Sequence, residues 1–390
     1  MNSRLRIVVL GYIVRGPLGG MTWHYLQYVL GLRRLGHEVL YVEDSGDDDW
    51  SCYDPRTGAI GPDYSYGISY VSTVFKKADL ESWAYYDAHS DTWLGPLGST
   101  APRMGRTSDI LINVSGSNEM RSWTDDIPYR VFIDTDPAFT QIRNRLEPKR
   151  MDRALAHNVF MTFGENVGRP DTSLVDDGFR WKPTRQPIVL DRWPVTTPSI
   201  SSPFRTVMQW ESYPKLEYEG QSLGMKSESF RSYIDLPKRT GAVMEMAVGG
   251  PDLPHKELEQ KGWRLTDPLQ VARDPWTYRD YIAGSIGEFS VAKAGYVSAD
   301  TGWFSERSAG FLASGRPVVV QDSGFSRWLN VDAGVLAFSN FEEATSAIDD
   351  VRSRPDHHAK AARTVAEDYF RSDLVLGELL EEAMDGDHNR

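Results

Sequence analysis

Short apolar runs alternate with longer amphipathic stretches along most of the chain, a pattern typical of parallel strands connected by helices. The first apolar run, residues 5–12, is followed by a Gly- and Pro-rich loop at 15–20. Apolar residues then recur at three- and four-residue spacing over 22–35, and Gly36 ends this predicted helix. A second apolar run follows at 39–42. The chain is therefore predicted to open with a βαβ unit whose strands pair in parallel.

Three further apolar runs in the first half, at 109–114, 130–134 and 159–163, each end in small or polar residues. Such endings are typical of parallel strands whose carboxyl ends line a crevice. Before them, residues 45–105 lack periodicity and are rich in Tyr, Trp, Gly and Asp. We interpret this stretch as an insertion folded onto the first domain, whose aromatic side chains form either a platform for a ligand or a local core.

Five prolines between residues 183 and 203 mark the predicted boundary between an N-terminal domain, 1–198, and a C-terminal domain, 199–390. Beyond them the alternation resumes. The predicted strands lie at 206–210, 242–248, 288–292, 317–320 and 335–338. The predicted helices lie at 226–236, 305–314, 341–352, 357–370 and 372–384. The sequence thus predicts an α/β protein with two Rossmann-like parallel sheets.

Composition and charge exclude several classes of protein. The 390 residues are 40% hydrophobic, enough for a sizeable core, and their net charge is −12. An acidic chain lacks the basic surface that nucleic acids and anionic membranes select, so no nucleic-acid partner is expected. No apolar run reaches about 18 residues, so we expect no integral membrane segment, no signal peptide and a cytoplasmic location. Cys52 is the only cysteine, and we expect it to be a bystander.

Residues 302–325 carry the clearest candidate chemistry. Ser305 is a suitable N-cap for the helix predicted after it. The N–H groups and the positive dipole of a helix start attract anions, and Arg307 and Ser308 would add a charge and a hydroxyl. A pyrophosphate fits such a site. The alternative is that Ser305 only caps the helix and Arg307 is a solvated side chain.

Two lysines are expected near the same helix start. Lys293 follows the strand predicted at 288–292, and Lys226 opens a helix after the strand at 206–210. Because the carboxyl ends of parallel strands share one edge, both should reach the crevice, where cations suit a diphosphate. Asp322 follows the next strand and could accept hydrogen bonds from sugar hydroxyls. Taken alone, each lysine is more often a surface charge.

One loop and two segments carry a resemblance to a known family. They are the Gly19-Gly20 loop, the helix end Arg-Leu-Gly-His-Glu-Val at 34–39 and the segment Ala-Ser-Gly-Arg-Pro-Val-Val at 313–319. Together with the two α/β halves they resemble glycosyltransferases of the GT-B fold. The resemblance implies two Rossmann-like domains facing a cleft, with C-terminal helices crossing back to the first domain. It also implies a nucleoside-diphosphate sugar bound by the second domain, an acceptor bound by the first, and no metal or other cofactor.

The sequence departs from the pattern of many retaining members, which carry two glutamates eight residues apart. Gly302 and Gly310 occupy those places, with Glu306 between them, so the usual ribose-binding acid is missing and the stereochemical outcome is not predicted. The donor box of plant-type inverting enzymes is also absent. The remaining resemblance is to an atypical bacterial branch similar to families 1 and 4. The predicted donor-site residues are Lys226, Lys293, Trp303, Phe304, Ser305, Glu306, Arg307, Ser308, Asp322, Ser323, Gly324 and Phe325.

The candidate catalytic bases are His24, Asp134 and Asp136. His24 lies in the first turn predicted after Gly19 and Gly20, which we assign to the acceptor side, and a helix start would keep its imidazole neutral. An ordinary helix-start histidine is at least as good an interpretation. Asp134-Thr135-Asp136 resembles a metal-binding D-x-D motif but ends a strand of the first domain, so a base or acceptor-binding role suits it better. Alternatively, Asp136 only starts a turn.

The hypothesis that follows is a glycosyltransferase that moves a sugar from a nucleoside-diphosphate sugar to a small molecule such as a natural product. One alternative is a sugar-nucleotide 2-epimerase of the same fold, and another is a non-catalytic two-domain ligand-binding protein. A nicotinamide oxidoreductase is disfavoured because the glycines at 11, 16, 19 and 20 do not form G-x-G-x-x-G. The sugar, the nucleotide, the acceptor and the oligomeric state are not predicted.

Overall fold

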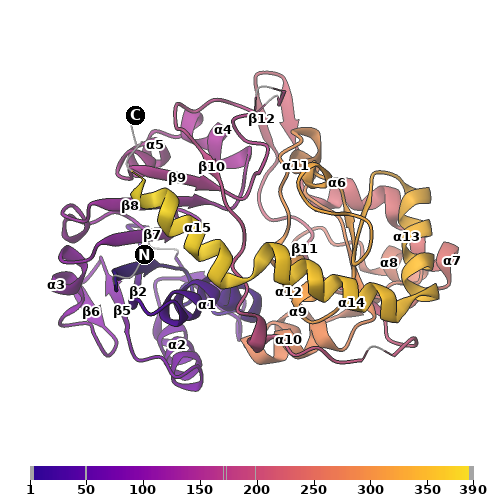
Figure 1. Cartoon of the computed structure of the whole chain (residues 1–390), viewed down its shortest axis with the longest axis horizontal. Coiled ribbons are helices and arrows are strands. Elements are labelled where there is room, and N and C mark those ends of the chain that lie inside the picture. The colour runs from indigo at the N-terminus through magenta and orange to yellow at the C-terminus, as the bar shows by residue number, and fades with distance from the viewer. Residues whose placement is uncertain (1–3, 49–50, 170, 173, 198, 386–390) are drawn as a thin grey trace.

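The computed structural model describes residues 4–48, 51–169, 171–172, 174–197 and 199–385. Two mainly parallel sheets with their helices lie side by side and make up its two halves (Figure 1). The chain passes from the first sheet to the second between residues 183 and 204. Residue 198, at the predicted domain boundary, lies outside the described residues. No described helix has the length and apolar character needed to cross a membrane.

The first sheet has the strand order β10-β9-β8-β7-β1-β2-β5-β6. Its neighbours are parallel except β5 and β6, and in its centre Val8 pairs with Leu40 on one side and Leu111 on the other. The strands are β1 (Arg6–Leu10), β2 (Glu38–Asp44), β5 (Trp83–Asp87), β6 (Thr92–Leu94), β7 (Ile110–Val114), β8 (Tyr129–Asp134), β9 (Val159–Thr162) and β10 (Lys182–Pro183).

The second sheet is parallel throughout, with the order β15-β14-β11-β16-β17-β18. Its strands are β11 (Phe204–Gln209), β14 (Met244–Gly249), β15 (Arg264–Thr266), β16 (Gly287–Ser290), β17 (Val318–Gln321) and β18 (Val335–Phe338). In both sheets the strand order reverses beside the first strand, between β1 and β7 and between β11 and β16. Ligands of doubly wound folds bind outside the carboxyl ends of the strands at such a point.

Helices and two hairpins complete the fold. The helices are α1 (Gly19–Arg34), α2 (Ser65–Lys77), α3 (Ala101–Arg106), α4 (Phe139–Leu146), α5 (Pro148–Leu155), α6 (Lys226–Phe230), α7 (Leu236–Thr240), α8 (His255–Gln260), α9 (Pro268–Val271), α10 (Pro275–Ala283), α11 (Ala294–Ser298), α12 (Glu306–Ala313), α13 (Phe341–Ser353), α14 (Pro355–Val365) and α15 (Ser372–Met384). The hairpins join β3 (Cys52–Asp54) to β4 (Ala59–Gly61) and β12 (Leu216–Tyr218) to β13 (Gln221–Leu223). Short 3-10 turns lie at Ser122–Thr124, Leu190–Arg192, Arg231–Tyr233 and Phe325–Arg327, and a π turn lies at Ala366–Phe370.

The C-terminal helices cross from the second half back to the first, as the resemblance implies. Helix α14 packs on α12, and α15 (yellow in Figure 1) packs on α1. Gly31 of α1 permits the close approach, since a Cβ there would lie 2.4 Å from Leu376 Cδ1. The last helix therefore holds the two halves together by apolar packing.

Residues 45–105 are not simply an insertion, because they contribute two strands to the first sheet. Strand β5 pairs in parallel with β2, and β6 continues the edge in antiparallel. Aromatic side chains build this region: Trp83 packs against Phe75, and Tyr85 against Tyr64. Trp83 and Tyr85 are buried, so the local-core interpretation holds for them.

Two predicted element boundaries are wrong. Helix α1 begins at Gly19, so Gly19 and Gly20 form its first turn and are not a loop. Gly19 serves close packing against the other half of the molecule, because a Cβ there would lie 2.4 Å from the carbonyl oxygen of Asp274. The helix predicted at 226–236 is divided into α6 and a 3-10 turn before α7 begins at Leu236.

His157, which follows α5, is held neutral in the folded state. It is 1% exposed, its Nδ1 lies 2.9 Å from the carbonyl oxygen of Arg153, and its Nε2 lies 3.2 Å from Asn113 Nδ2. The carbonyl accepts from Nδ1–H and the amide donates to Nε2, an arrangement that only the neutral ring satisfies. Burial lowers the pKa of His157 to about 4.

We predict that His157 makes the fold sensitive to mild acid. In the unfolded chain it titrates near 6.5, so stability from the neutral ring is complete above that pH and is lost as the pH falls toward 4, by about 3 kcal/mol. Thermal unfolding measured from about pH 4.5 to 7.5 should show a shallower pH dependence for His157→Gln than for the wild type. The exposed His255→Gln is the matched control, and an unchanged slope in His157→Gln would contradict this assignment.

Candidate active site

The strand-order reversals of the two sheets bring distant segments to one crevice. Helix α1, which carries His24, follows β1, and Ser115 follows β7; His24 Nε2 lies 3.4 Å from Ser115 Oγ across the reversal of the first sheet. Lys226 and Lys293 follow β11 and β16, the strands that flank the reversal of the second sheet. The crevice therefore gathers the candidate base and both candidate lysines, which are far apart in sequence.

The start of α12 forms the floor of a small pocket at the ends of β16 and β17. Its volume is about 20 Å³. Ser305 caps the helix as predicted, its Oγ accepting from the N–H of Arg307 at 3.2 Å. Six of the predicted donor-site residues line the pocket, namely Trp303, Phe304, Ser305, Arg307, Ser308 and Phe325. Trp303 also carries a buried indole N–H with no partner among the described residues.

Arg307 does not present a free positive charge. Its Nε donates to Glu288 Oε1 at 2.6 Å, its Nη2 to Ser290 Oγ at 2.6 Å and its Nη1 to the carbonyl of Val207 at 2.8 Å. Arg307 and Glu288 are both buried, so the pair is internally neutral. Arg307 therefore braces the ends of β11 and β16 beneath the pocket.

Lys226 is the cation that is available to a ligand. It is half-buried and forms no hydrogen bond or ion pair within the part of the chain that the structure describes. Burial, together with the nearby charge of Arg307, lowers the pKa of Lys226 to about 7. An anion bound beside this amine would hold it in the charged form.

Asp136 joins the two halves across the crevice. Its Oδ1 accepts from Lys293 Nζ at 2.8 Å, its Oδ2 accepts from the hydroxyl of Tyr213 at 2.6 Å, and the hydroxyl of Tyr296 donates to it as well. The ring of Phe139 packs edge-on against both tyrosines. Burial alone would raise the pKa of Asp136, but Lys293 and the hydrogen bonds hold it below its ordinary value.

Asp134 is a structural residue of the first half. It is 1% exposed and accepts from the side chains of Thr140, Gln141 and Thr162 and from the N–H of Asp136. Burial raises the pKa of Asp134 to about 6 against these hydrogen bonds. Asp134 shapes the turn that carries Asp136. The carboxylate oxygens of both aspartates already accept hydrogen bonds from described residues, whereas Nδ1 of His24 has no partner among them.

His24 remains the best-placed candidate base. It lies in the second turn of α1, one turn later than predicted, and the rings of Tyr25 and Phe163 meet it edge-on. Burial lowers the pKa of His24, whereas nearby Glu306 raises it. Burial is therefore sufficient to favour the neutral imidazole.

The loop after β17 serves the fold. Asp322 Oδ1 accepts from the N–H of Gly324 at 2.8 Å, and its Oδ2 bonds the hydroxyl of Ser326, so Asp322 closes a turn. Ser323 Oγ donates to the carbonyl of Trp303. Gly324 has φ of +93°, and a Cβ there would collide with Asp300. The hydrogen bonds of Asp322 and Ser323 thus stabilise the loop beside the pocket. Gly19 and Gly20, the predicted acceptor-side residues, pack against α10.

Three residues of this crevice had not been singled out from the sequence: Tyr213, Tyr296 and Glu288. Glu288 carries a usable signal, because an acid inside a short apolar strand needs a buried partner. The two tyrosines carry none, since their pairing with Asp136 depends on how the halves pack.

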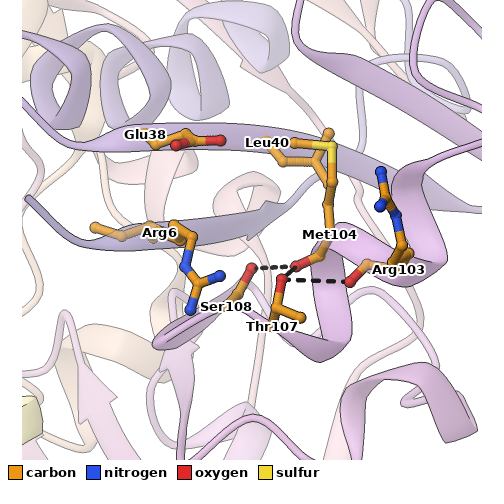
Figure 2. Close-up of a pocket in the computed structure, with 8 residues that line it drawn as sticks. Arg6, Glu38, Leu40, Arg103, Met104, Thr107 and Ser108 are labelled. Carbon is orange, nitrogen blue, oxygen red and sulfur yellow. Dashed lines mark hydrogen bonds between the residues drawn. The ribbon is translucent and has the colours of Figure 1, made fainter.

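A larger hollow of about 220 Å³ lies at the opposite, amino-terminal edge of the first sheet (Figure 2). Arg6 and Glu38 reach it from neighbouring strands, and Arg103 and Met104 from α3. Arg6 pairs with Asp109 and Glu38 with Arg4, so these two charges are satisfied. It shares no residue with the crevice. Among the described residues, no group of three His, Cys, Asp or Glu side chains could hold a metal ion.

Comparison with solved structures identifies the fold. An alpha-glucosyltransferase in complex with UDP matches with a TM-score of 0.61 and 14% identity over 97% of this chain and 99% of its own. HepE from Anabaena, in complex with UDP and glucose, matches with a TM-score of 0.57 and 12% identity over 97% and 99%. AviGT4, a glycosyltransferase involved in avilamycin A biosynthesis, matches with a TM-score of 0.52 and 13% identity over 97% of each chain.

These likenesses confirm the GT-B fold for this chain, with its two Rossmann-like sheets facing one crevice. The resemblance drawn from residues 19–20, 34–39 and 313–319 is thereby confirmed at the level of the fold. No protein-family model matches the sequence, and no curated protein is similar to it in sequence.

We predict that the Asp136–Lys293 pair couples the two halves energetically. Lys293→Met should lower the free energy of unfolding by about 2 kcal/mol, because it leaves a partly buried carboxylate without its cation. A double-mutant cycle with Asp136→Asn, followed by urea denaturation, should give a coupling of about 1 kcal/mol or more. Arg150→Met, which breaks the exposed Arg150–Glu147 pair, is the control. Additive effects of the two crevice substitutions would contradict the prediction.

Proposed function

We propose that this protein transfers a sugar from a nucleoside-diphosphate sugar to a small-molecule acceptor. The observation that carries the proposal is the half-buried Lys226, which has no partner among the described residues and lies near the start of α12, at the strand-order reversal of the second sheet. A lysine without a protein partner and a helix start are complementary to a diphosphate. The GT-B fold is consistent with this placement.

The residues on either side of the crevice have separate roles in this proposal. On the donor side, Lys226 and the first N–H groups of α12 stabilise the negative charge that grows on the leaving diphosphate. On the acceptor side, His24 accepts the proton of the attacking hydroxyl, and its lowered pKa keeps it neutral for that step. Arg307 and Glu288 hold the donor side rigid, which limits reorganisation during the reaction.

Uridine diphosphate is the first nucleotide to test, because two of the similar structures named above contain UDP. The acceptor is proposed to be a small molecule such as a natural product. The net charge of −12 disfavours a nucleic-acid acceptor, since the phosphate backbone rewards a basic surface. We further propose that no metal is needed, the charge of Lys226 standing in for one.

We predict that nucleotide binding at Lys226 takes up a proton. Because the free amine has a pKa of about 7, the affinity for UDP should fall about tenfold or more between pH 7.5 and 9, where the diphosphate itself is fully ionised. Lys226→Arg should bind with no such pH dependence, and Lys226→Ala should bind about tenfold or more weakly than the wild type at pH 7.5, with the difference shrinking toward pH 9 as the wild-type amine loses its charge. Isothermal titration calorimetry measures both, with the exposed Lys256→Ala as the control. Normal binding in Lys226→Ala would exclude this donor site.

We predict that His24 acts on the rate and not on donor binding. His24→Asn should lower kcat by about a hundredfold or more while the Kd for UDP changes less than about twofold. Until the acceptor is known, slow hydrolysis of the sugar nucleotide, with water in place of the acceptor, is the readout. His255→Asn on α8 is the matched control. Equal hydrolysis rates in His24→Asn and the wild type would remove His24 from the base role.

A further inference from the structure

A second small cavity lies in the seam between the two halves, and it shares Arg307 with the small pocket at the ends of β16 and β17. Its volume is about 20 Å³, and its lining includes His24 and Gln27 of α1, Trp193 of the connecting segment and Glu306 of α12. It therefore brings a candidate base of the first half together with a carboxylate of the second.

Two buried N–H groups of this cavity's lining have no partner. Gln27 is 3% exposed; its Oε1 accepts from the N–H of Val189 at 2.8 Å, but its Nε2 has no partner among the described residues. Trp193 is 2% exposed, and its indole Nε1–H also has no hydrogen-bond partner among the described residues. Buried polar groups in native proteins are almost always hydrogen-bonded. Two such donors beside one cavity point to a small polar occupant that accepts hydrogen bonds.

The cavity also has acceptors. Glu306 is half-buried, and its carboxylate forms no hydrogen bond or ion pair with any residue that the structure describes. The adjacent cation, Arg307, is already paired with Glu288. His24 contacts Ser115 through Nε2, and its Nδ1 has no partner within the described ranges. A cavity of this volume holds one water molecule, which needs two to four polar partners.

We propose that the seam cavity holds one ordered water that links the carboxylate of Glu306 to the imidazole of His24. The water accepts from Gln27 Nε2–H and Trp193 Nε1–H and donates to Glu306 and to the free ring nitrogen of His24. When Nδ1 of His24 takes up a proton, the water turns to accept from Nδ1–H in place of one of its two earlier donors, because its oxygen has only two lone pairs. The water still donates to Glu306, whose negative charge stabilises the imidazolium. Glu306 is thus a positioning residue that acts on the base from the opposite half.

Glu306 is the one unbalanced charge among the described groups that face His24. Those groups are Tyr25 and Tyr28 on its own helix, Tyr278 from α10, Glu306 and Arg307 from α12, and the uncharged Ser115 and Phe163 from the ends of β7 and β9. Burial raises the pKa of all three tyrosines, so they stay neutral. Arg307 is balanced by Glu288.

The link is tested by the titration of His24 in the intact protein, with its proton NMR signal identified by its absence in His24→Gln. Glu306→Gln should lower the pKa of His24 by about half a unit or more, and Glu306→Asp, which keeps the charge, should restore it. Glu257→Gln, which removes an exposed carboxylate in the first turn of α8, is the control. An unchanged His24 pKa in Glu306→Gln would overturn the proposal.

The water itself is tested by a high-resolution crystal structure of the wild type and of Trp193→Phe. One water within hydrogen-bond distance of Gln27 Nε2 and Trp193 Nε1, weakened or lost in Trp193→Phe, is expected; a dry cavity in the wild type would overturn the proposal. Neither readout needs sugar transfer. Only the effect on catalysis rests on the proposed function. If the protein transfers sugar as proposed, the acidic limb of its pH–rate profile should move to lower pH in Glu306→Gln by the amount that the His24 pKa falls.

Discussion

The crevice depends on one carboxylate that crosses it. Asp136 receives a lysine and two tyrosine hydroxyls from the opposite half, and this cluster fixes the distance between the carboxyl ends of the two sheets. A charge so placed is costly to bury unless every oxygen is satisfied, so the arrangement tolerates little change. Two further contacts act in the same direction: the N–H of Gly19 donates to the carbonyl of Ala272, and α15 packs on α1. The alignment of His24 with Glu306 follows from these three contacts.

The positive charges of the crevice are divided between structure and ligand. Arg307 is paired with Glu288, and Lys293 with Asp136, so these two cations hold the scaffold. Lys226 has no hydrogen-bond or ion-pair partner among the described residues, and burial together with the charge of Arg307 lowers its pKa. In the absence of a ligand, this amine and the nearby helix start are complementary to an anion. Binding would then relieve an unfavourable arrangement as well as create a new contact.

The sequence predicted what local physical chemistry decides. Apolar runs located most strands of the two sheets but missed β5, β6, β10 and β15. Ser305 was correctly assigned as the N-cap of α12. Long-range packing decided the rest. Position 19 is a glycine because the carbonyl of Asp274 leaves no room for a side chain, and Trp83 lies in a sheet strand although its neighbours lack an aliphatic pattern. The pairing of Arg307 with Glu288 likewise depends on long-range packing, because Glu288 lies in a strand 19 residues earlier in the chain.

The central claim is that a diphosphate binds at the start of α12 beside Lys226. A crystal structure of the protein soaked with UDP tests it most directly, because it locates the ligand without assuming a reaction. The account predicts density for the two phosphates within hydrogen-bond distance of Lys226 Nζ and the first N–H groups of α12. Phosphate density in the hollow lined by Arg6 and Arg103 at the far edge of the first sheet, with the crevice empty, would contradict it.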